Sequence, residues 1–155
     1  LLFITFFKIG KIKFAPGTLA SFITCLLFLL FVNLFNIVIL LFFTLLIALY
    51  SFIAINNSFD SFDSNDPQEI VIDEVVGQML PLLAVPIYET LYLAPKEYYC
   101  IAAFILFRLF DIWKPFPINY IDINTEGSLG IMLDDILAGI YTIIILIIIF
   151  FFIGA

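Results

Sequence analysis

Long apolar segments separated by short polar ones dominate this chain. No charged residue occurs from Phe14 to Phe59, a run more than twice as long as the roughly 20 residues that one membrane-spanning helix needs. Two helices that turn near Asn33 and Asn36 fit this run. A second charge-free segment, Ile136 to Ala155, is long enough for a final span. The pattern therefore predicts a polytopic helical membrane protein.

The region between these runs is apolar but interrupted. Residues 75–88 carry no charge yet contain two prolines, which favours a tilted, kinked or re-entrant helix. Glu89 to Glu97 is typical of a turn, and Tyr98 to Phe107 predicts a further short apolar helix that ends before Pro115. These two segments either dip into the membrane as a hairpin or cross it. We expect an all-α bundle of four to five transmembrane or re-entrant helices, with residues 118–130 mostly in a loop.

The first 14 residues form a separate short segment. Leu1 to Phe14 is apolar but carries three lysines, so it is typical of an interfacial segment rather than a span. Pro16 and Gly17 predict a turn, after which Thr18 caps the first long helix. The lysines favour a cytoplasmic N-terminus by the positive-inside rule. They are Lys8, Lys11 and Lys13.

The longest polar segment, Asn57 to Glu69, predicts a solvated acidic loop on the cytoplasmic side. Its aspartates, Asp60, Asp63 and Asp66, recur at every third residue. A calcium-binding EF-hand loop instead alternates its ligands around a central glycine. We therefore expect no calcium site in this loop.

Composition narrows the possible functions. Hydrophobic residues make up 65% of the 155 positions, and the mean hydropathy of +1.23 is that of a membrane protein. This length suits a single domain over residues 1–155. The net charge of −7 and the lack of a basic face exclude nucleic acid as a partner. Cys25 and Cys100 lie apart in apolar runs, which predicts reduced, buried thiols.

Two acid pairs stand out because each is followed, about one helical turn later, by a glycine. A small residue in that position lets a neighbouring helix approach closely, so two helices are predicted to cross near their acidic ends. Four carboxylates would then converge, and oxygen-only ligands favour a hard cation such as Mg²⁺. In a simpler interpretation, each pair only starts a helix and faces its macrodipole. The pairs are Asp73 and Glu74 with Gly77, and Asp134 and Asp135 with Gly139.

A second set of charges lies in an apolar, aromatic stretch. Arg108, Asp111 and Lys114 are spaced so that they share one helical face. An arginine and a lysine beside a carboxylate-held metal suit a phosphate group, although a structural ladder of ion pairs is the alternative. Trp113 is expected to anchor the chain at the membrane interface.

Small and hydroxyl residues at two predicted helix starts add candidate anion-binding groups. Gly17 and Thr18 precede the first long helix, and Ser128 and Gly130 precede the second acid pair. Their backbone N–H groups and hydroxyls suit a bound anion, although the same residue types also occur in ordinary caps and turns.

Four blocks of this sequence resemble, in order and spacing, the bacterial phosphatidylglycerophosphatase A family. The resemblance extends from about Lys11 to Tyr141. It implies an all-helical, Mg²⁺-dependent lipid phosphatase of the inner membrane that hydrolyses phosphatidylglycerophosphate to phosphatidylglycerol and phosphate. The blocks are residues 15–21 (APGTLAS), 66–77 (DPQEIVIDEVVG), 107–118 (FRLFDIWKPFPI) and 127–139 (GSLGIMLDDILAG).

The resemblance also places the family's motif positions on this sequence, and we see none that is lost here. These positions are Gly17, Thr18, Asp73, Glu74, Gly77, Arg108, Asp111, Lys114, Pro115, Gly130, Asp134, Asp135 and Gly139.

The residues present limit the mechanism. The chain has no histidine, neither cysteine lies in a phosphatase loop, and no Asp-x-Asp-x-Thr motif occurs, so direct attack by a metal-activated water is the simplest route. We expect Arg108 and Lys114 to stabilise the phosphoryl charge, and Asp111 to be the general base or a further ligand. One or two Mg²⁺ ions would be held by Asp73, Glu74, Asp134 and Asp135.

Other functions remain open from the sequence. A small ion channel or transporter also uses intramembrane charges, but here they cluster near one predicted membrane face, which we expect to be the cytoplasmic one. A lipid phosphotransferase would share the phosphate site and need a second, alcohol-binding pocket. A structural subunit would have no evident use for the acid pairs. The sequence does not indicate an oligomeric state.

Overall fold

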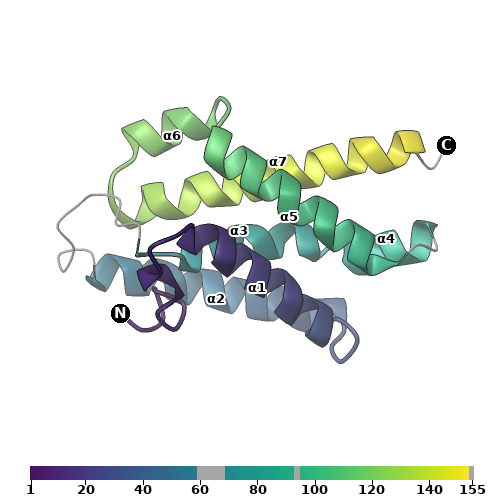
Figure 1. Ribbon diagram of the computed structural model, residues 1–155, viewed down its shortest axis with the longest axis horizontal. Coiled ribbons are helices and arrows are strands. Elements are labelled where there is room, and N and C mark those ends of the chain that lie inside the picture. The colour runs from purple at the N-terminus through teal and green to yellow at the C-terminus, as the bar shows by residue number, and fades with distance from the viewer. Residues whose placement is uncertain (59–68, 93–94, 154–155) are drawn as a thin grey trace.

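The computed structural model describes residues 1–58, 69–92 and 95–153, and within these ranges the chain is helical, with no strand (Figure 1). The prediction of an all-α protein is therefore confirmed. Asp60, Asp63 and Asp66 of the predicted acidic loop lie outside the described residues. The elements are a short 3-10 helix η1 (Ile9–Lys11), then α1 (Pro16–Phe31), α2 (Ile37–Ser58), α3 (Ile72–Leu82), α4 (Val85–Tyr92), α5 (Lys96–Trp113), α6 (Ile118–Asn124) and α7 (Gly127–Ile153).

The chain passes along the bundle in α1, in α2, in α3 with α4, in α5 and in α7 (Figure 1). Glu74 at the start of α3 lies 3.9 Å from Arg108 near the end of α5, which places both at one end of the bundle. At the opposite end, the ring centroid of Tyr88 in α4 lies 4.5 Å from that of Phe150 near the end of α7. The two short apolar segments therefore extend between the two ends of the bundle, and the predicted helical membrane bundle is confirmed.

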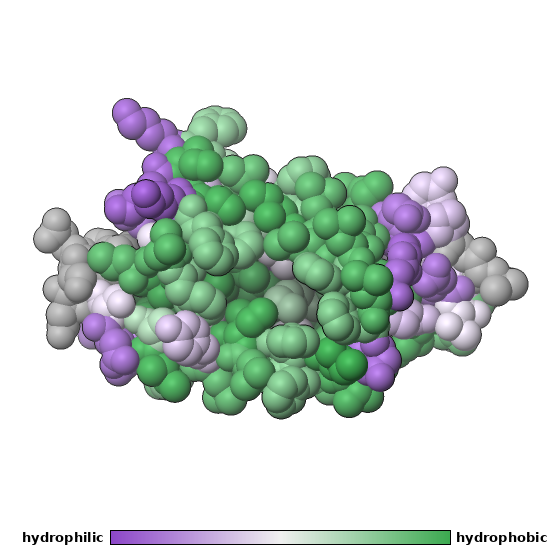
Figure 2. Space-filling view, turned by 90° about the horizontal axis from the view of Figure 1, so that it is seen from below, coloured by the Kyte–Doolittle hydropathy of each residue, from purple (hydrophilic) through white to green (hydrophobic). Residues whose placement is uncertain are grey.

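The surface is that of a membrane protein. Three helical stretches in the described residues are long and apolar enough to span a bilayer: Ile37–Ser58, Ile72–Tyr92 and Gly127–Phe152. α1 is apolar but shorter. Figure 2 shows hydrophobic residues over the middle of the molecule and hydrophilic ones gathered at its two ends. Such a wide exposed apolar band is stable only in lipid.

The third pass is bent, as the prolines predicted. α3 contains Pro81 and ends at Leu82, and α4 starts at Val85 after a two-residue turn. A proline inside a helix removes a backbone hydrogen bond and clashes with the preceding turn. α4 then continues to Tyr92, so the predicted turn over Glu89 to Glu97 was too long.

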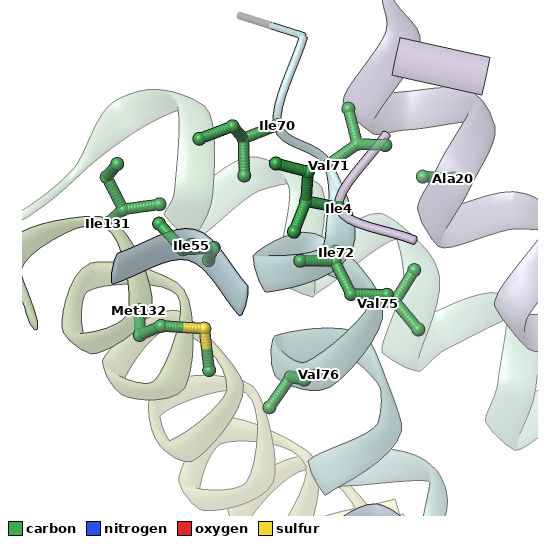
Figure 3. Packing of buried hydrophobic residues seen from close by; sticks show 10 residues of the cluster. All are labelled: Ile4, Ala20, Ile55, Ile70, Val71, Ile72, Val75, Val76, Ile131 and Met132. Atoms are coloured by element: carbon green, nitrogen blue, oxygen red, sulfur yellow. The ribbon is translucent and has the colours of Figure 1, made fainter. Parts of the chain in front are cut away.

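A buried cluster surrounds the start of α3 (Figure 3). The N-terminal segment takes part in it: Ile4 is fully buried, and its carbonyl oxygen accepts hydrogen bonds from the N–H groups of Val71 (3.0 Å) and Ile72 (3.2 Å). The prediction of a purely interfacial segment was therefore incomplete, because its middle supports α3 while Phe7 and Phe14 stay exposed. Ala20, Ile55, Ile70, Val75, Val76, Ile131 and Met132 complete the cluster.

A second buried cluster fills the far half of the bundle, where residues of α1, α4, α5 and α7 meet. Cys25 and Cys100 belong to it as free, buried thiols, which confirms the prediction for both cysteines.

α3 and α7 cross at their glycines. A Cβ atom on Gly77 would lie 2.7 Å from the carbonyl oxygen of Asp135, and one on Gly139 would lie 2.5 Å from the carbonyl oxygen of Gly77. Those distances are shorter than van der Waals contact, so only glycine allows the two backbones to approach this closely. The predicted crossing of two helices beside their acid pairs is therefore confirmed.

The region from 118 to 130 is not the loop that the sequence predicted. Ile118 starts α6 and is fully buried against Phe107, Phe110 and Ala138, so tertiary packing stabilises a helix that the local sequence indicates only weakly. α7 begins at Gly127 rather than near Ile136. The charges of Asp134 and Asp135 therefore lie inside this helix, and the macrodipole explanation fails for that pair.

Candidate active site

A cavity of about 440 Å³ opens at the end of the bundle where α1, α3 and α7 begin and α5 ends. It brings together every predicted metal-binding and catalytic residue, which come from distant parts of the chain. The predicted site residues that line it are Gly17, Thr18, Asp73, Glu74, Arg108, Asp111, Lys114, Gly130, Asp134 and Asp135.

Three carboxylates meet in this cavity. Oxygen atoms of Asp73, Glu74 and Asp135 all lie within 4.8 Å of one another. Asp73 and Asp135 are buried and Glu74 is nearly so. Their proximity follows from the fold, because the glycine crossing of α3 and α7 presses the first turn of α3 against the turn of α7 that carries Asp135.

The environment of these carboxylates fits a metal ion. Asp73 Oδ1 and Glu74 Oε2 are buried without a hydrogen-bond partner among the described residues. Nη1 of Arg108 lies 3.9 Å from a carboxylate oxygen of Glu74. Neither Asp73 nor Asp135 forms a salt bridge within the described residues. Burying a carboxylate without a partner costs free energy, and a bound cation would offset that cost. A site whose ligand atoms are all oxygens prefers a hard divalent cation such as Mg²⁺.

Asp134, the neighbour of Asp135, has a different environment. Lys114 Nζ donates to Asp134 Oδ2 and to Asp122 Oδ1, both at 2.7 Å. Burial lowers the pKa of Lys114, but these two charged hydrogen bonds outweigh burial and hold the pKa above its usual value, so Lys114 stays protonated. Asp134 Oδ1 is buried without a partner among the described residues, which leaves one of its oxygens for a ligand.

The predicted basic face is only partly present. Arg108 Nη1 lies 2.6 Å from Asp111 Oδ2, one turn further along α5. Lys114 is no longer helical, since α5 ends at Trp113 and Lys114 adopts a left-handed conformation (φ 45°) that turns the chain toward α6. Arg108 Nε is buried and has no hydrogen-bond partner in the described part of the chain, so the guanidinium keeps a donor for an anion.

The start of α1 also faces the cavity. Ala15 precedes the helix and makes no side-chain capping bond, and the first N–H that donates along α1 is that of Leu19, to Ala15. The prediction that Thr18 caps this helix was therefore wrong, because Pro16 starts it and Thr18 lies inside it. The N–H groups of Gly17 and Thr18 are left without intrahelical acceptors, as at helix starts that bind anions.

The second predicted anion-binding stretch is divided by the structure. Gly130 lines the cavity, but Ser128 does not: it is buried and its hydroxyl donates to Asn56 Oδ1 at 3.3 Å, joining α7 to α2. Successive residues of a helix point about 100° apart, so Ser128 faces α2 although its neighbour Gly127 lines the cavity.

Two further charged residues line the cavity that the sequence pattern did not indicate as site residues, Asp122 and Lys13. Asp122 lies on α6, in the stretch expected to be a loop, so no helical spacing related it to Lys114. Lys13 was assigned only to the basic N-terminal segment. It lies far along the chain from the other charged site residues, so no spacing in the sequence related it to them.

The fold and this cavity define an integral membrane protein that gathers acidic and basic groups at one end of a helical bundle, as a membrane enzyme acting on phosphate would. The model of one family, phosphatidylglycerophosphatase A, matches residues 2–150. This chain belongs to that family, and it is a lipid phosphatase.

Two curated relatives are similar over most of the chain, and a third is similar over about half of it. A protein of Bacteroides thetaiotaomicron named "Putative phosphatidylinositol-3-phosphatase" is 39% identical over 145 residues, which cover 92% of this chain and 87% of that protein. Phosphatidylglycerophosphatase A of Haemophilus influenzae is 38% identical, with 90% of this chain and 81% of that protein covered. The enzyme of the same name from Escherichia coli is 41% identical over 49% of this chain and 40% of its own length. No solved structure matches this chain.

Proposed function

We propose that this protein hydrolyses phosphatidylglycerophosphate to phosphatidylglycerol and inorganic phosphate, with Mg²⁺, at the cytoplasmic face of the bacterial inner membrane. The observation that carries the proposal is the group of three carboxylates, two buried and one nearly so, beside Arg108. The buried Nε of Arg108 has no hydrogen-bond partner among the described residues. Two relatives named phosphatidylglycerophosphatase A support this lipid as the substrate. Residues 1–155 would act as a single domain.

The residues that would hold Mg²⁺ are Asp73, Glu74 and Asp135, with Asp134 as a fourth acid that has one oxygen available. When bound there, Mg²⁺ would neutralise negative charge on the phosphoryl oxygens and lower the pKa of the attacking water.

Arg108 and Asp111 would act as a pair. The 2.6 Å ion pair between them orients the guanidinium, and Nε remains to donate to a phosphoryl oxygen. Asp111 lines the cavity and would accept a proton from the attacking water. The positive charge of Arg108 then stabilises the negative charge that spreads over the phosphoryl oxygens during transfer.

Two further groups would hold the phosphate from other sides. The N–H groups of Gly17 and Thr18 point along the start of α1, where the helix dipole favours an anion. Lys114 would contribute a point charge, since its pKa is raised and it stays protonated. Gly130 would face the substrate through its backbone, since it lines the cavity while the carbonyl oxygen of Thr125 fills the space that a side chain would occupy.

The orientation in the membrane follows from the basic N-terminal segment. Lys13 lines the cavity and Lys11 lies 3.7 Å from Glu69, just before α3, so this segment lies at the cavity end. Positive residues favour the cytoplasmic side, and the cavity would open there. The phosphate of the substrate would enter the cavity while its acyl chains stay in the bilayer.

The experiment that tests this function measures inorganic phosphate released from phosphatidylglycerophosphate by purified protein in detergent micelles. We expect release with Mg²⁺ and almost none with EDTA, because removal of the ion leaves the buried carboxylates and the phosphate mutually repulsive. Phosphatidylinositol 3-phosphate, suggested by the name of the Bacteroides relative, serves as the competing substrate.

A folded sample that releases no phosphate from either lipid with Mg²⁺ present would contradict the proposal. Equal release of phosphate with EDTA and with Mg²⁺ would contradict only the proposed metal requirement, not the lipid phosphatase activity. Faster release from the inositol lipid would reassign the substrate while keeping the site.

Replacement of Gly17 by alanine tests the position of Glu74. The added Cβ would meet the Glu74 carboxylate, the end of a flexible side chain that can rotate away. We expect the protein to stay folded while the Mg²⁺ concentration needed for half-maximal activity rises about tenfold, because a displaced ligand binds the ion less well. Titration of activity with Mg²⁺ measures this shift. An unchanged titration would show that Glu74 does not hold the ion.

A further inference from the structure

The cations that line the cavity differ in their partners. Three occur there among the described residues: Lys13, Arg108 and Lys114. Arg108 is paired with Asp111, and Lys114 with Asp122 and Asp134. Lys13 forms no ion pair with any described residue, so within this part of the chain its charge is not compensated.

The position of Lys13 is also different from that of the other two. It lies in the segment between η1 and α1, is exposed, and lines the rim of the cavity. Its neighbours in sequence are apolar and exposed, Ile12 by 44% and Phe14 by 87%. Exposed aromatic and basic side chains side by side are typical of the head-group level of a membrane protein.

The charge balance of the cavity gives Lys13 a role. Six carboxylates and three cations line it, and an anionic lipid that approaches is therefore repelled until a metal ion compensates part of the charge. An uncompensated cation at the rim, at head-group level, attracts the part of the substrate that remains there. In the proposed substrate, the phosphodiester that joins the two glycerols lies between the acyl chains and the terminal phosphate.

We propose that Lys13 binds the phosphodiester of the lipid while the Arg108 end of the cavity holds the terminal phosphomonoester. The site would thereby select lipids that carry both groups, and Lys13 would act in substrate binding rather than in the chemical step. This inference rests on the proposed function, since it assigns a second part of the same substrate. A charged hydrogen bond between an ammonium and a phosphodiester oxygen is strong enough to affect affinity.

The test compares Lys13→Gln with Lys8→Gln and Lys11→Gln. All three remove one exposed positive charge from the same segment, but only Lys13 lines the cavity. For phosphatidylglycerophosphate in mixed micelles, we expect Lys13→Gln to raise KM about tenfold with kcat unchanged, because the lost contact is the same in the ground state and the transition state. Lys8→Gln and Lys11→Gln should leave KM within about twofold, and Lys13→Arg should restore it.

Inhibition by inorganic phosphate distinguishes the two parts of the substrate. Free phosphate occupies only the phosphomonoester position, so its inhibition constant should be the same for Lys13→Gln and the unsubstituted protein. An unchanged KM in Lys13→Gln, an equal rise in all three glutamine variants, a fall in kcat, or weaker inhibition by phosphate would each overturn the inference. Failure of the proposed function is distinct, since the unsubstituted protein would then release no phosphate.

Discussion

Replacement of Asp135 by asparagine is expected to lower the turnover of phosphatidylglycerophosphate by at least about 1000-fold, which corresponds to roughly 4 kcal/mol of transition-state stabilisation. Asp135 is buried, and its carboxylate belongs to the group whose oxygens lie within 4.8 Å of one another. Asparagine keeps the shape of the side chain and removes its charge, so a divalent ion loses one of three anionic ligands. Steady-state phosphate release at saturating lipid measures the loss.

The same substitution should not destabilise the protein in EDTA. Without an ion, the acidic group of Asp135 lies close to Asp73 and Glu74 with little cationic compensation, and removing it lowers their mutual repulsion. We expect the midpoint of thermal unfolding in EDTA to stay the same or to rise. A structural carboxylate would show the opposite sign, because its loss leaves its partners unsatisfied.

Glu126→Gln is the matched control for this prediction. Glu126 is an exposed acid directly before α7 that does not line the cavity, so the substitution removes the same charge from the same end of the molecule. Its turnover should stay within about twofold of the unsubstituted protein, as for surface charges away from a site. Turnover of Asp135→Asn within tenfold of normal would contradict a metal-binding role for Asp135.

Replacement of Gly77 by alanine is expected to have the second largest effect. The new Cβ would lie 2.7 Å from the carbonyl oxygen of Asp135 and 2.7 Å from the ring of Phe107, which is fully buried. A backbone atom cannot rotate away, so α3 and α7 must separate. We expect a loss of about 1–3 kcal/mol in the free energy of unfolding, as for other overpacked cores. Thermal unfolding in detergent measures this loss.

Activity should fall by about 100-fold or more in the folded fraction of Gly77→Ala, because a displacement of about 1 Å between groups that act together has an effect of this size. Gly17→Ala is the comparison, since it adds the same methyl group against the flexible end of Glu74 rather than against a backbone. Normal stability and activity of Gly77→Ala would show that the close crossing of α3 and α7 is not needed for the site.

The parts of the fold predicted from the sequence are those with strong local signals. The turn between α1 and α2 was predicted from two asparagines, Asn33 and Asn36, in a long apolar run without charges. Oδ1 of Asn36 accepts a hydrogen bond from the N–H of Ile39 at 3.0 Å. The bend after Pro81 and the end of α5 before Pro115 follow from the missing N–H of proline. α6 was missed because its helix depends on the burial of Ile118 by distant residues.

The candidate site was predicted as a set of residues but not as an arrangement. Two adjacent acids, Asp134 and Asp135, look equivalent in the sequence. Successive residues of an α-helix point about 100° apart, however, so packing turns Asp135 toward α3 and leaves Asp134 beside Lys114. The same reason removes Ser128 from the cavity.

By itself the sequence determined that this is an apolar, helical membrane protein, and that its acid pairs and small residues belong to a crossing of two helices. Those properties depend on local composition and on spacing along one helix. Only the tertiary structure decided which three carboxylates meet and which of the cations lining the cavity has no acidic partner among the described residues. It also showed that the N-terminal segment supports α3. These depend on how each helix is rotated about its axis, and contacts between segments far apart in the chain set that rotation.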